Sequence, residues 1–348
     1  MSKKGVIIRI KSSDLKPYEK TKNFWKQSSL SFPKAIHVIQ LFKAHNKFSE
    51  LIDKKNSLFL KGQLCDNKCQ GARINILPNG EKIDKAFSLF AEDLTLHDES
   101  SNSHWDVIFK NPNEKYAYCY SLRKKEKSTK RKYNLVNEFE KKYDQIEKKA
   151  YDSIKTGEIM PLAIITLLKT CMRVGNEIFY KLHKSKGLTT LKKRDIAIKG
   201  DEITFKYLSK GGVPIETKER FPSLFINNFK KYLISLKNND FIFAGKDKKP
   251  LKDTDFKKTF KEYCGIGFYP HIVRSYYATK RVEDFLMKDN QPQKEEVKKL
   301  LLDISEKLGH KKFNKQNNLW QNNSTVTISH YIDPRLVEKI NDIVSPAK

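Results

Sequence analysis

The chain has 348 residues, of which 38% are hydrophobic and 11% aromatic, so it can bury two cores and is not a disordered protein. Lys and Arg number 69 against 41 Asp and Glu, and the formal net charge of +28 favours a polyanionic partner, usually nucleic acid. A lysine-rich proteome encoded by an AT-rich genome is the alternative explanation of this charge.

Cysteine usage and hydrophobic run lengths indicate where the protein acts. The five cysteines form no disulfide framework, and the Cys65-x3-Cys69 pair lacks a second pair that would complete a zinc site. The segment Met1–Gly5 has no apolar signal-peptide core, and the longest apolar run, Leu162–Leu168, is too short to cross a bilayer. We therefore expect a soluble intracellular protein that contacts no membrane and needs no metal.

Residues 1–121 are predicted to form a β-rich N-terminal domain. A hairpin is expected where Pro78-Asn79-Gly80 follows a β-type run, because Asn-Gly accepts the positive φ angles of a tight turn. The short β-type runs that support this domain are Val6–Ile10, Ser57–Leu60, Arg73–Leu77, Trp105–Phe109 and Lys115–Tyr120.

A strongly basic stretch follows this domain. Seven of the ten residues from Arg123 to Lys132 are Lys or Arg, and we interpret residues 122–132 as a solvated linker between two domains. Cations of this kind also attract phosphates without reading sequence. The candidate DNA-binding residues are Lys124, Lys125, Lys130, Arg131 and Lys132.

Residues 133–348 are predicted to form a mainly helical domain. Pro161 opens a helix that we expect to run from Leu162 to about Lys184 with Arg173 in its middle. A three-stranded β-meander follows, with Lys210 at the mouth of its second glycine turn. The overall fold class is therefore α+β. Further helices are predicted at about Thr254–Tyr263, His271–Met287, Lys294–Leu308 and Pro334–Ile343.

The residue types needed to cut a phosphodiester occur in this helical domain. Arginine can bond two phosphate oxygens while keeping its charge, lysine or histidine can protonate a leaving oxygen, and a tyrosine can attack phosphorus. A basic protein contains such residues in any case, so their order alone does not identify a site. The candidate catalytic residues are Arg173, Lys210, Arg274, His310 and Tyr331, with His271 as an additional member.

The local motifs around these residues are more specific. Cys171–Tyr180, with the sequence CMRVGNEIFY, and Gly187–Leu191, with the sequence GLTTL, resemble the core signature of type IB DNA topoisomerases. Pro270–Arg274, Leu308–His310 and Tyr331–Pro334 resemble later motifs of that family. The resemblance covers residues 130–345 and is to the small viral and bacterial form, which belongs with the tyrosine recombinases.

This resemblance implies a reaction that uses neither metal nor ATP, by a protein that acts on double-stranded DNA as a monomer. Tyr331 would form a 3′-phosphotyrosyl link, and Arg173, Arg274 and His310 would hold the phosphate oxygens. Lys210, directly or through Arg173, would protonate the 5′ oxygen. Supercoils would relax by swivelling before the 5′-hydroxyl attacks back. The source would be a large DNA virus, with action in the host cytoplasm, viral factory or virion, or a bacterium, with action at the nucleoid.

Several assignments stay open at this stage. His271 stands where many viral members have lysine, and His330 is a second choice for the role of His310. Tyr276 and Tyr277 are rival tyrosines that we expect on a helix, one of them in the core. We interpret Lys311–Asn323 as an inserted loop, and the N-terminal domain as a clamp on the far side of the duplex, by analogy.

Two other functions compete with the topoisomerase. A site-specific tyrosine recombinase would use the same residues in a synaptic tetramer, and a non-catalytic relative would only bind DNA. The sequences of the motifs around Arg173 and Gly187 favour the topoisomerase, and so does the β-rich N-terminal domain.

Overall fold

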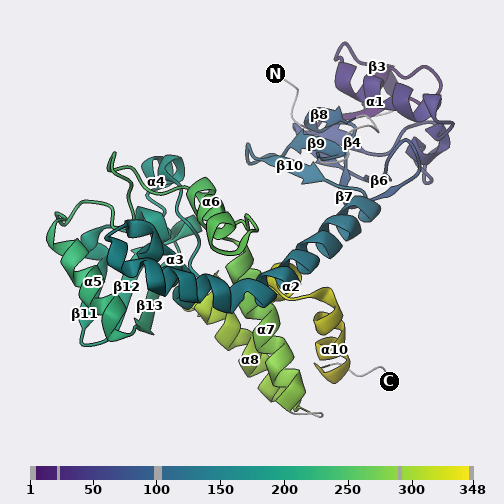
Figure 1. The fold of residues 1–348 in the computed structure, drawn as a ribbon. Coiled ribbons are helices and arrows are strands. Elements are labelled where there is room, and N and C mark those ends of the chain that lie inside the picture. The colour runs from purple at the N-terminus through teal and green to yellow at the C-terminus, as the bar shows by residue number, and fades with distance from the viewer. Residues whose placement is uncertain (1–4, 22–23, 98–103, 289–291, 345–348) are drawn as a thin grey trace. The chain divides into compact units, whose positions relative to one another are not determined.

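A computed structural model describes residues 5–21, 24–97, 104–288 and 292–344. The chain forms two compact units, Met1–Arg131 and Lys132–Lys348. The first contains most of the strands and the second most of the helices, so the predicted α+β class is confirmed (Figure 1).

The first unit contains two antiparallel sheets, a β-hairpin and the helix α1 (Pro33–Ala44). Sheet order is β3-β2-β1-β4-β5 in one and β10-β9-β8 in the other, while β6 pairs with β7. The strand bounds are β1 Ile7–Ile10, β2 Pro17–Lys20, β3 Trp25–Gln27, β4 Gln63–Cys65, β5 Lys68–Gln70, β6 Ile74–Ile76, β7 Lys82–Phe87, β8 Glu92–Leu96, β9 Val107–Lys110 and β10 Tyr116–Cys119.

Most predicted strands of this unit are present, including the hairpin after Ile76. The predicted strand Ser57–Leu60 is wrong, because this segment turns on itself: the Phe59 amide donates to Asn56 O and the segment makes only isolated bridges. Helix α1 was not predicted, although its buried side chains follow helical spacing. They are Ala35, Val38, Ile39 and Phe42.

The predicted linker 122–132 is helical, since these residues begin the 32-residue helix α2 (Leu122–Ser153), and the two units divide at the end of this stretch, between Arg131 and Lys132. Lys, Arg and Glu are good helix formers, and no Gly or Pro interrupts the stretch. Two of its lysines pair with carboxylates of the first unit: Lys124 lies 2.6 Å from Asp106, and Lys125 lies 3.5 Å from Asp84. A run of positive charge is therefore compatible with regular structure when acids lie beside it.

The second unit contains a meander in the order β11-β12-β13 and a set of helices, with β14 and β15 forming a hairpin. The strands are β11 Ile196–Lys199, β12 Glu202–Leu208, β13 Pro214–Arg220, β14 Lys311–Asn314 and β15 Leu319–Asn322. The helices are α3 Ile159–Thr170, α4 Glu177–His183, α5 Ser223–Ile234, α6 Asp253–Cys264, α7 Ile272–Lys288, α8 Lys294–Lys307, α9 Thr325–Tyr331 and α10 Pro334–Val344.

The predicted meander is confirmed, and the helices α6, α7, α8 and α10 are confirmed to within two residues at each end. The expected loop Lys311–Asn323 is a hairpin instead, in which Phe313 pairs with Trp320 and their rings lie 5.3 Å apart. An aromatic cross-strand pair of this kind stabilises a short hairpin.

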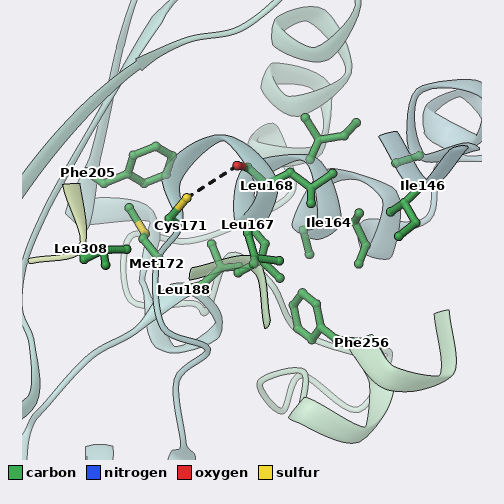
Figure 2. Close-up of a cluster of buried hydrophobic side chains, with 14 of the residues drawn as sticks. Ile146, Ile164, Leu167, Leu168, Cys171, Met172, Leu188, Phe205, Phe256 and Leu308 are labelled. Atoms are coloured by element: carbon green, nitrogen blue, oxygen red, sulfur yellow. Dashed lines mark hydrogen bonds between the residues drawn. The ribbon is translucent and has the colours of Figure 1, made fainter. Parts of the chain in front are cut away.

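The core of the second unit lies directly beneath the segments that carry the candidate residues. Helix α3 is apolar on nearly every face and is buried in the middle of this core. Figure 2 shows Cys171 and Met172, the two residues before Arg173, among the buried side chains, together with Leu188 and Leu308. The site residues are therefore tethered to close-packed neighbours, which limits how far they can move.

The described residues contain no helix with both the length and the apolar character that a bilayer span requires. Nor do three or more His, Cys, Asp or Glu side chains gather as metal ligands anywhere in those described ranges.

Candidate active site

The structure gathers five of the six predicted catalytic residues around Tyr331. Tyr331 is the last residue of α9, is 4% exposed, and its phenol oxygen lies 3.4 Å from Arg173 Nη2, which can donate to it. The ring centroid lies 4.8 Å from that of His310 and 5.3 Å from that of His271. The Arg274 guanidinium is 5.1 Å from the same ring. Residues 158 positions apart in the chain thus meet at one phenol.

Arg173 does not lie within a helix, so that prediction is wrong. Helix α3 ends at Thr170, and Cys171 adopts a left-handed φ of 53° that stops it. Residues 171–176 form a loop, and the Asn176 side chain then caps a separate helix, α4. Because the loop leaves the core at Met172, the half-buried Arg173 side chain can reach the phenol.

The Arg173 loop packs against the Gly187–Thr190 turn. The Leu188 amide donates to Arg173 O at 2.8 Å, and Thr189 Oγ1 donates to Gly175 O at 3.2 Å. A Cβ atom at Gly187 would lie 2.5 Å from Arg173 O and 2.8 Å from Gly175 N. The two most specific sequence motifs are therefore one structural unit, and its glycines allow the backbones to touch.

Substituting Gly187 by alanine is expected to shift the Arg173 backbone, because the new methyl would overlap main-chain atoms that cannot rotate away. Overpacking of this kind costs about 1–3 kcal/mol. We expect a lower urea midpoint together with a slower reaction at Tyr331, the DNA cleavage that the motif resemblance implies. Gly200→Asn is the matched control, since Gly200 has open space around it and asparagine accepts its φ of 61°. Equal cleavage by Gly187→Ala and wild type would mean that Arg173 does not depend on this contact.

Arg274, on α7, is 2% exposed and has no carboxylate partner among the described residues. Its Nη1 donates to Cys171 O at 2.6 Å, and its Nη2 donates to Leu308 O at 2.8 Å. Its buried Nε–H has no partner within the described part of the chain. Burying such a donor is costly, so an unused one beside Tyr331 is available to an incoming anion.

His310 belongs to a chain of hydrogen bonds that fixes its tautomer. Arg274 can only donate, so the contact of 3.1 Å between its Nη2 and His310 Nε2 makes Nε2 the acceptor. Nδ1 then carries the proton and donates to Thr327 Oγ1 at 2.8 Å. Thr327 lies 2.8 Å from Ser305 Oγ, which in turn donates to Leu301 O at 2.6 Å. The imidazole is held at both nitrogens.

Burial, reinforced by the charges of Arg274 and Arg173, lowers the pKa of His310 to about 3. The ring is therefore neutral at pH 7. In the unfolded chain the same ring takes up a proton below its ordinary pKa of 6.5. The unfolded state thus binds more protons between about pH 6.5 and pH 3, and His310 favours unfolding increasingly as the pH falls through that window.

His310→Asn is expected to weaken this acid sensitivity, since asparagine does not titrate. Between pH 7 and pH 5 the urea midpoint of wild type should fall further than that of His310→Asn. The two slopes can be measured on the same pH series. Parallel slopes would mean that His310 titrates in the folded protein as it does in the unfolded chain.

His271 lines a cavity of about 510 Å³. Loss of solvation and the cations Arg274, Arg173 and Lys132 lower its pKa to about 4. Because the His271 side chain is exposed, solvent offsets some of this effect, and the direction alone indicates a neutral ring at pH 7. The cavity is lined by Arg173, Val174, Asp253, Tyr269, Pro270, His271 and Tyr331.

Lys210 is not part of this cluster. It is exposed in the turn Lys210–Gly212 between β12 and β13, and no contact within the described residues joins it to Tyr331 or Arg173. Gly211 and Gly212 beside it have open space around them. The turn therefore offers an accessible ammonium and does not hold it at the phenol.

The alternative residues are placed elsewhere. The His330 side chain is exposed, whereas His310 contacts both Arg274 and the Tyr331 ring. Tyr276 and Tyr277 lie on α7 as expected, and both are partly buried against the core. Tyr276 packs against aromatic residues of α2, with ring centroids 5.1–5.4 Å apart.

The predicted DNA-binding residues have different surroundings. Lys124 and Lys125 are in the ion pairs described above, while Lys130 and Arg131 are exposed. Lys132 is half-buried, and its Nζ lies 5.5 Å from the centroid of the Tyr331 ring. The basic stretch is thus not one uniform phosphate-binding surface.

Sequence reasoning missed the residues that support the nucleophile and the histidine. Thr327 lies four residues before Tyr331, on the same face of α9, and this spacing was a usable signal. Thr279 Oγ1 donates to Tyr331 O at 3.3 Å, and Tyr133 Oη donates to Ile332 O at 2.6 Å. Neither of these two has a motif that would single it out.

The family model described as "Eukaryotic DNA topoisomerase I, catalytic core" matches residues 121–330, more than half of the chain. No curated protein sequence matches this chain. Among solved structures, the XerH site-specific recombinase bound to difH substrate in a pre-cleavage complex is 20% identical with a TM-score of 0.33, covering 49% of this chain and 50% of that one. The XerH post-cleavage complex with palindromic difH substrate is 18% identical with a TM-score of 0.34, covering 56% and 51%. The chain thus spans about half the length of these structures. By the extent of the family match, the chain belongs to the family of the eukaryotic DNA topoisomerase I catalytic core.

Proposed function

We propose that the protein is a type IB DNA topoisomerase that nicks one strand of duplex DNA through Tyr331, lets supercoils relax and reseals the strand. The observation that carries this proposal is the meeting of two arginines and a histidine at one buried tyrosine. Membership of the topoisomerase I family supports the same reaction class.

In the proposed cleavage step, Tyr331 Oη attacks a backbone phosphorus as the bond to the 5′ oxygen breaks. Negative charge grows on the non-bridging oxygens, and fixed donors aimed at that charge lower the barrier. Arg173 contacts the phenol oxygen, so its fork is in place to bond the phosphate that the phenol attacks. Arg274 contributes the unused Nε–H. The product is a 3′-phosphotyrosyl link and a free 5′-hydroxyl.

The leaving oxygen needs a proton, and His310 is not placed to supply it, because its Nδ1–H donates to Thr327 Oγ1 and its Nε2 accepts from Arg274. We assign this proton to Lys210, directly or through Arg173. Its glycine-flanked turn is free to close on bound DNA. His310 would then orient Arg274, which bonds the phosphate. Resealing is the reverse step, and the covalent link keeps the bond energy without a nucleotide.

We propose the small viral or bacterial form as the subtype, from the wording of the motifs Cys171–Tyr180 and Gly187–Leu191. The N-terminal unit is proposed to act as a clamp on the duplex, with the exposed Lys130 and Arg131 contacting phosphates. Action as a monomer is part of the same proposal. The second candidate is a site-specific tyrosine recombinase, which the histidine at position 271 favours.

Relaxation of supercoiled plasmid in EDTA without ATP tests the proposal, with detergent added at intervals to trap covalent DNA. A ladder of relaxed topoisomers with a 3′-linked adduct would support the topoisomerase. An adduct on a specific site without relaxation would indicate the recombinase. Folded protein that binds DNA and gives neither product would overturn both enzymatic functions.

A further inference from the structure

The nucleophile occupies the end of a very short helix. Helix α9 has seven residues and stops at Tyr331, because Ile332 is already extended with φ −98° and ψ 141°. The last carbonyls of any α-helix lack partners within the helix and must find them elsewhere. A seven-residue helix is also too short to be stable alone. The position of the phenol therefore depends on what holds this helix end.

Three donors from other helices hold three consecutive carbonyls at this point. Lys132 Nζ donates to His330 O, and Tyr133 Oη donates to Ile332 O at 2.6 Å. Thr279 Oγ1 donates to Tyr331 O at 3.3 Å and also accepts from the Asp333 amide. Lys132 and Tyr133, which are neighbours in α2, thus donate hydrogen bonds to the carbonyls of the residues before and after Tyr331.

The surroundings of Lys132 differ from those of an ordinary surface lysine. Its ammonium lies over two tyrosine rings, 4.9 Å from the centroid of Tyr133 and 5.5 Å from that of Tyr331. Within the described part of the chain no carboxylate pairs with it. Burial lowers its pKa to about 8, so the group is still charged at pH 7 at some cost. A half-buried cation with a lowered pKa and no acid beside it is a candidate for a functional role.

The hydrogen bonds of Lys132 and Tyr133 and the charge of Lys132 indicate a role in holding the nucleophile. We propose that Lys132 and Tyr133 are positioning residues for Tyr331, which fix the end of α9 so that the phenol oxygen stays on the line of attack. Lys132 additionally places a positive charge beside the phenol as that oxygen loses its proton. This inference rests on the proposed strand cleavage by Tyr331, and it concerns the attacking group alone, not the leaving group.

The test is single-turnover formation of the covalent adduct at saturating duplex, measured beside DNA affinity. Lys132→Met is expected to slow adduct formation by about 100-fold, the effect of a displacement of roughly 1 Å at a reacting atom. Lys132→Arg should recover much of this rate because it restores the donor and charge. The affinity of Lys132→Met for DNA should fall only slightly, because the variant loses a single positive charge. Lys148→Met, at an exposed lysine of the same helix, is the matched control.

A modified substrate separates positioning from proton donation. Replacing the bridging 5′ oxygen by sulfur gives a thiolate leaving group, which needs no proton to depart. The defect of Lys132→Met should persist on this substrate. Full rescue by sulfur would overturn the inference and make Lys132 a leaving-group acid.

Tyr133→Phe provides a second test that does not depend on the folding of Lys132→Met. This substitution keeps the ring and removes only the hydroxyl that donates to Ile332 O. We expect the cleavage rate to fall about tenfold, because one hydrogen bond that aligns the end of α9 is lost. A wild-type rate in Tyr133→Phe, with a wild-type rate also in any folded Lys132→Met, would overturn the inference. Absence of adduct with the wild-type protein would instead count against the proposed function.

Discussion

Replacing Tyr331 by phenylalanine is expected to abolish the covalent adduct and plasmid relaxation while DNA binding survives. The ring would keep its contacts with His310 and Arg274, so the fold should be preserved. Only the phenol oxygen is lost, and removal of a nucleophile costs at least about 10⁴-fold in rate. The measurement is adduct formation on a labelled duplex, with affinity determined by a gel-shift or anisotropy assay.

Tyr276→Phe is the control for this prediction, because Tyr276 lies on α7 and packs against α2 through its ring. It should cleave DNA as wild type does. Cleavage retained by Tyr331→Phe would identify a different nucleophile, and tyrosines of α7 would be the next to examine. Loss of DNA binding in Tyr331→Phe would mean that the phenol contributes to binding before it reacts.

Arg274→Lys is expected to reduce cleavage by about 10²- to 10³-fold and to lower stability as well. The loss of rate follows from the loss of a fixed donor at the developing charge. The loss of stability follows because a lysine cannot bond both Cys171 O and Leu308 O in place of the guanidinium fork. Each buried carbonyl left without a donor costs about 1–3 kcal/mol. Urea unfolding and single-turnover cleavage measure the two effects separately.

Arg281→Lys serves as the comparison, since Arg281 is exposed on the same helix. Its stability to urea and its single-turnover cleavage rate should both remain close to those of the wild type. Wild-type cleavage by Arg274→Lys would mean that charge alone, without the planar fork, suffices at this position. Unchanged stability would mean that other donors replace the guanidinium at the two carbonyls.

Much of the fold could be predicted because its signals are local. The meander β11-β12-β13 follows from alternating strands with glycine turns, and α6, α7 and α8 follow from helical spacing with clear ends. The break at Cys171 could not be predicted in the same way. Its cause is non-local, since residues of the Gly187–Thr190 turn capture the carbonyls of Arg173 and Gly175. Tertiary contacts overrode a strong helical pattern there.

The candidate site was predictable where residues carry a motif. Arg173, Arg274, His310 and Tyr331 are found together, as their motifs implied. The residues that support these side chains could not be predicted, because Thr279 and Tyr133 donate hydrogen bonds to backbone carbonyls. Many side chains can donate to a carbonyl, so no residue type or spacing marks such a role. Lys132 was singled out for its charge and then found beside the nucleophile.

The hydrogen bonds of the site cations have a thermodynamic consequence. Arg173, Arg274 and Lys132 are bonded to a phenol, to carbonyls and to an imidazole, and no carboxylate neutralises them among the described residues. Asp253 lines the cavity, but within the described residues no ion pair joins its carboxylate to these cations. The protein without DNA therefore keeps like charges close together at the expense of its own stability. Under the proposed function we expect a bound phosphodiester to relieve that repulsion, which would link binding to folding and make DNA a stabilising ligand of the protein.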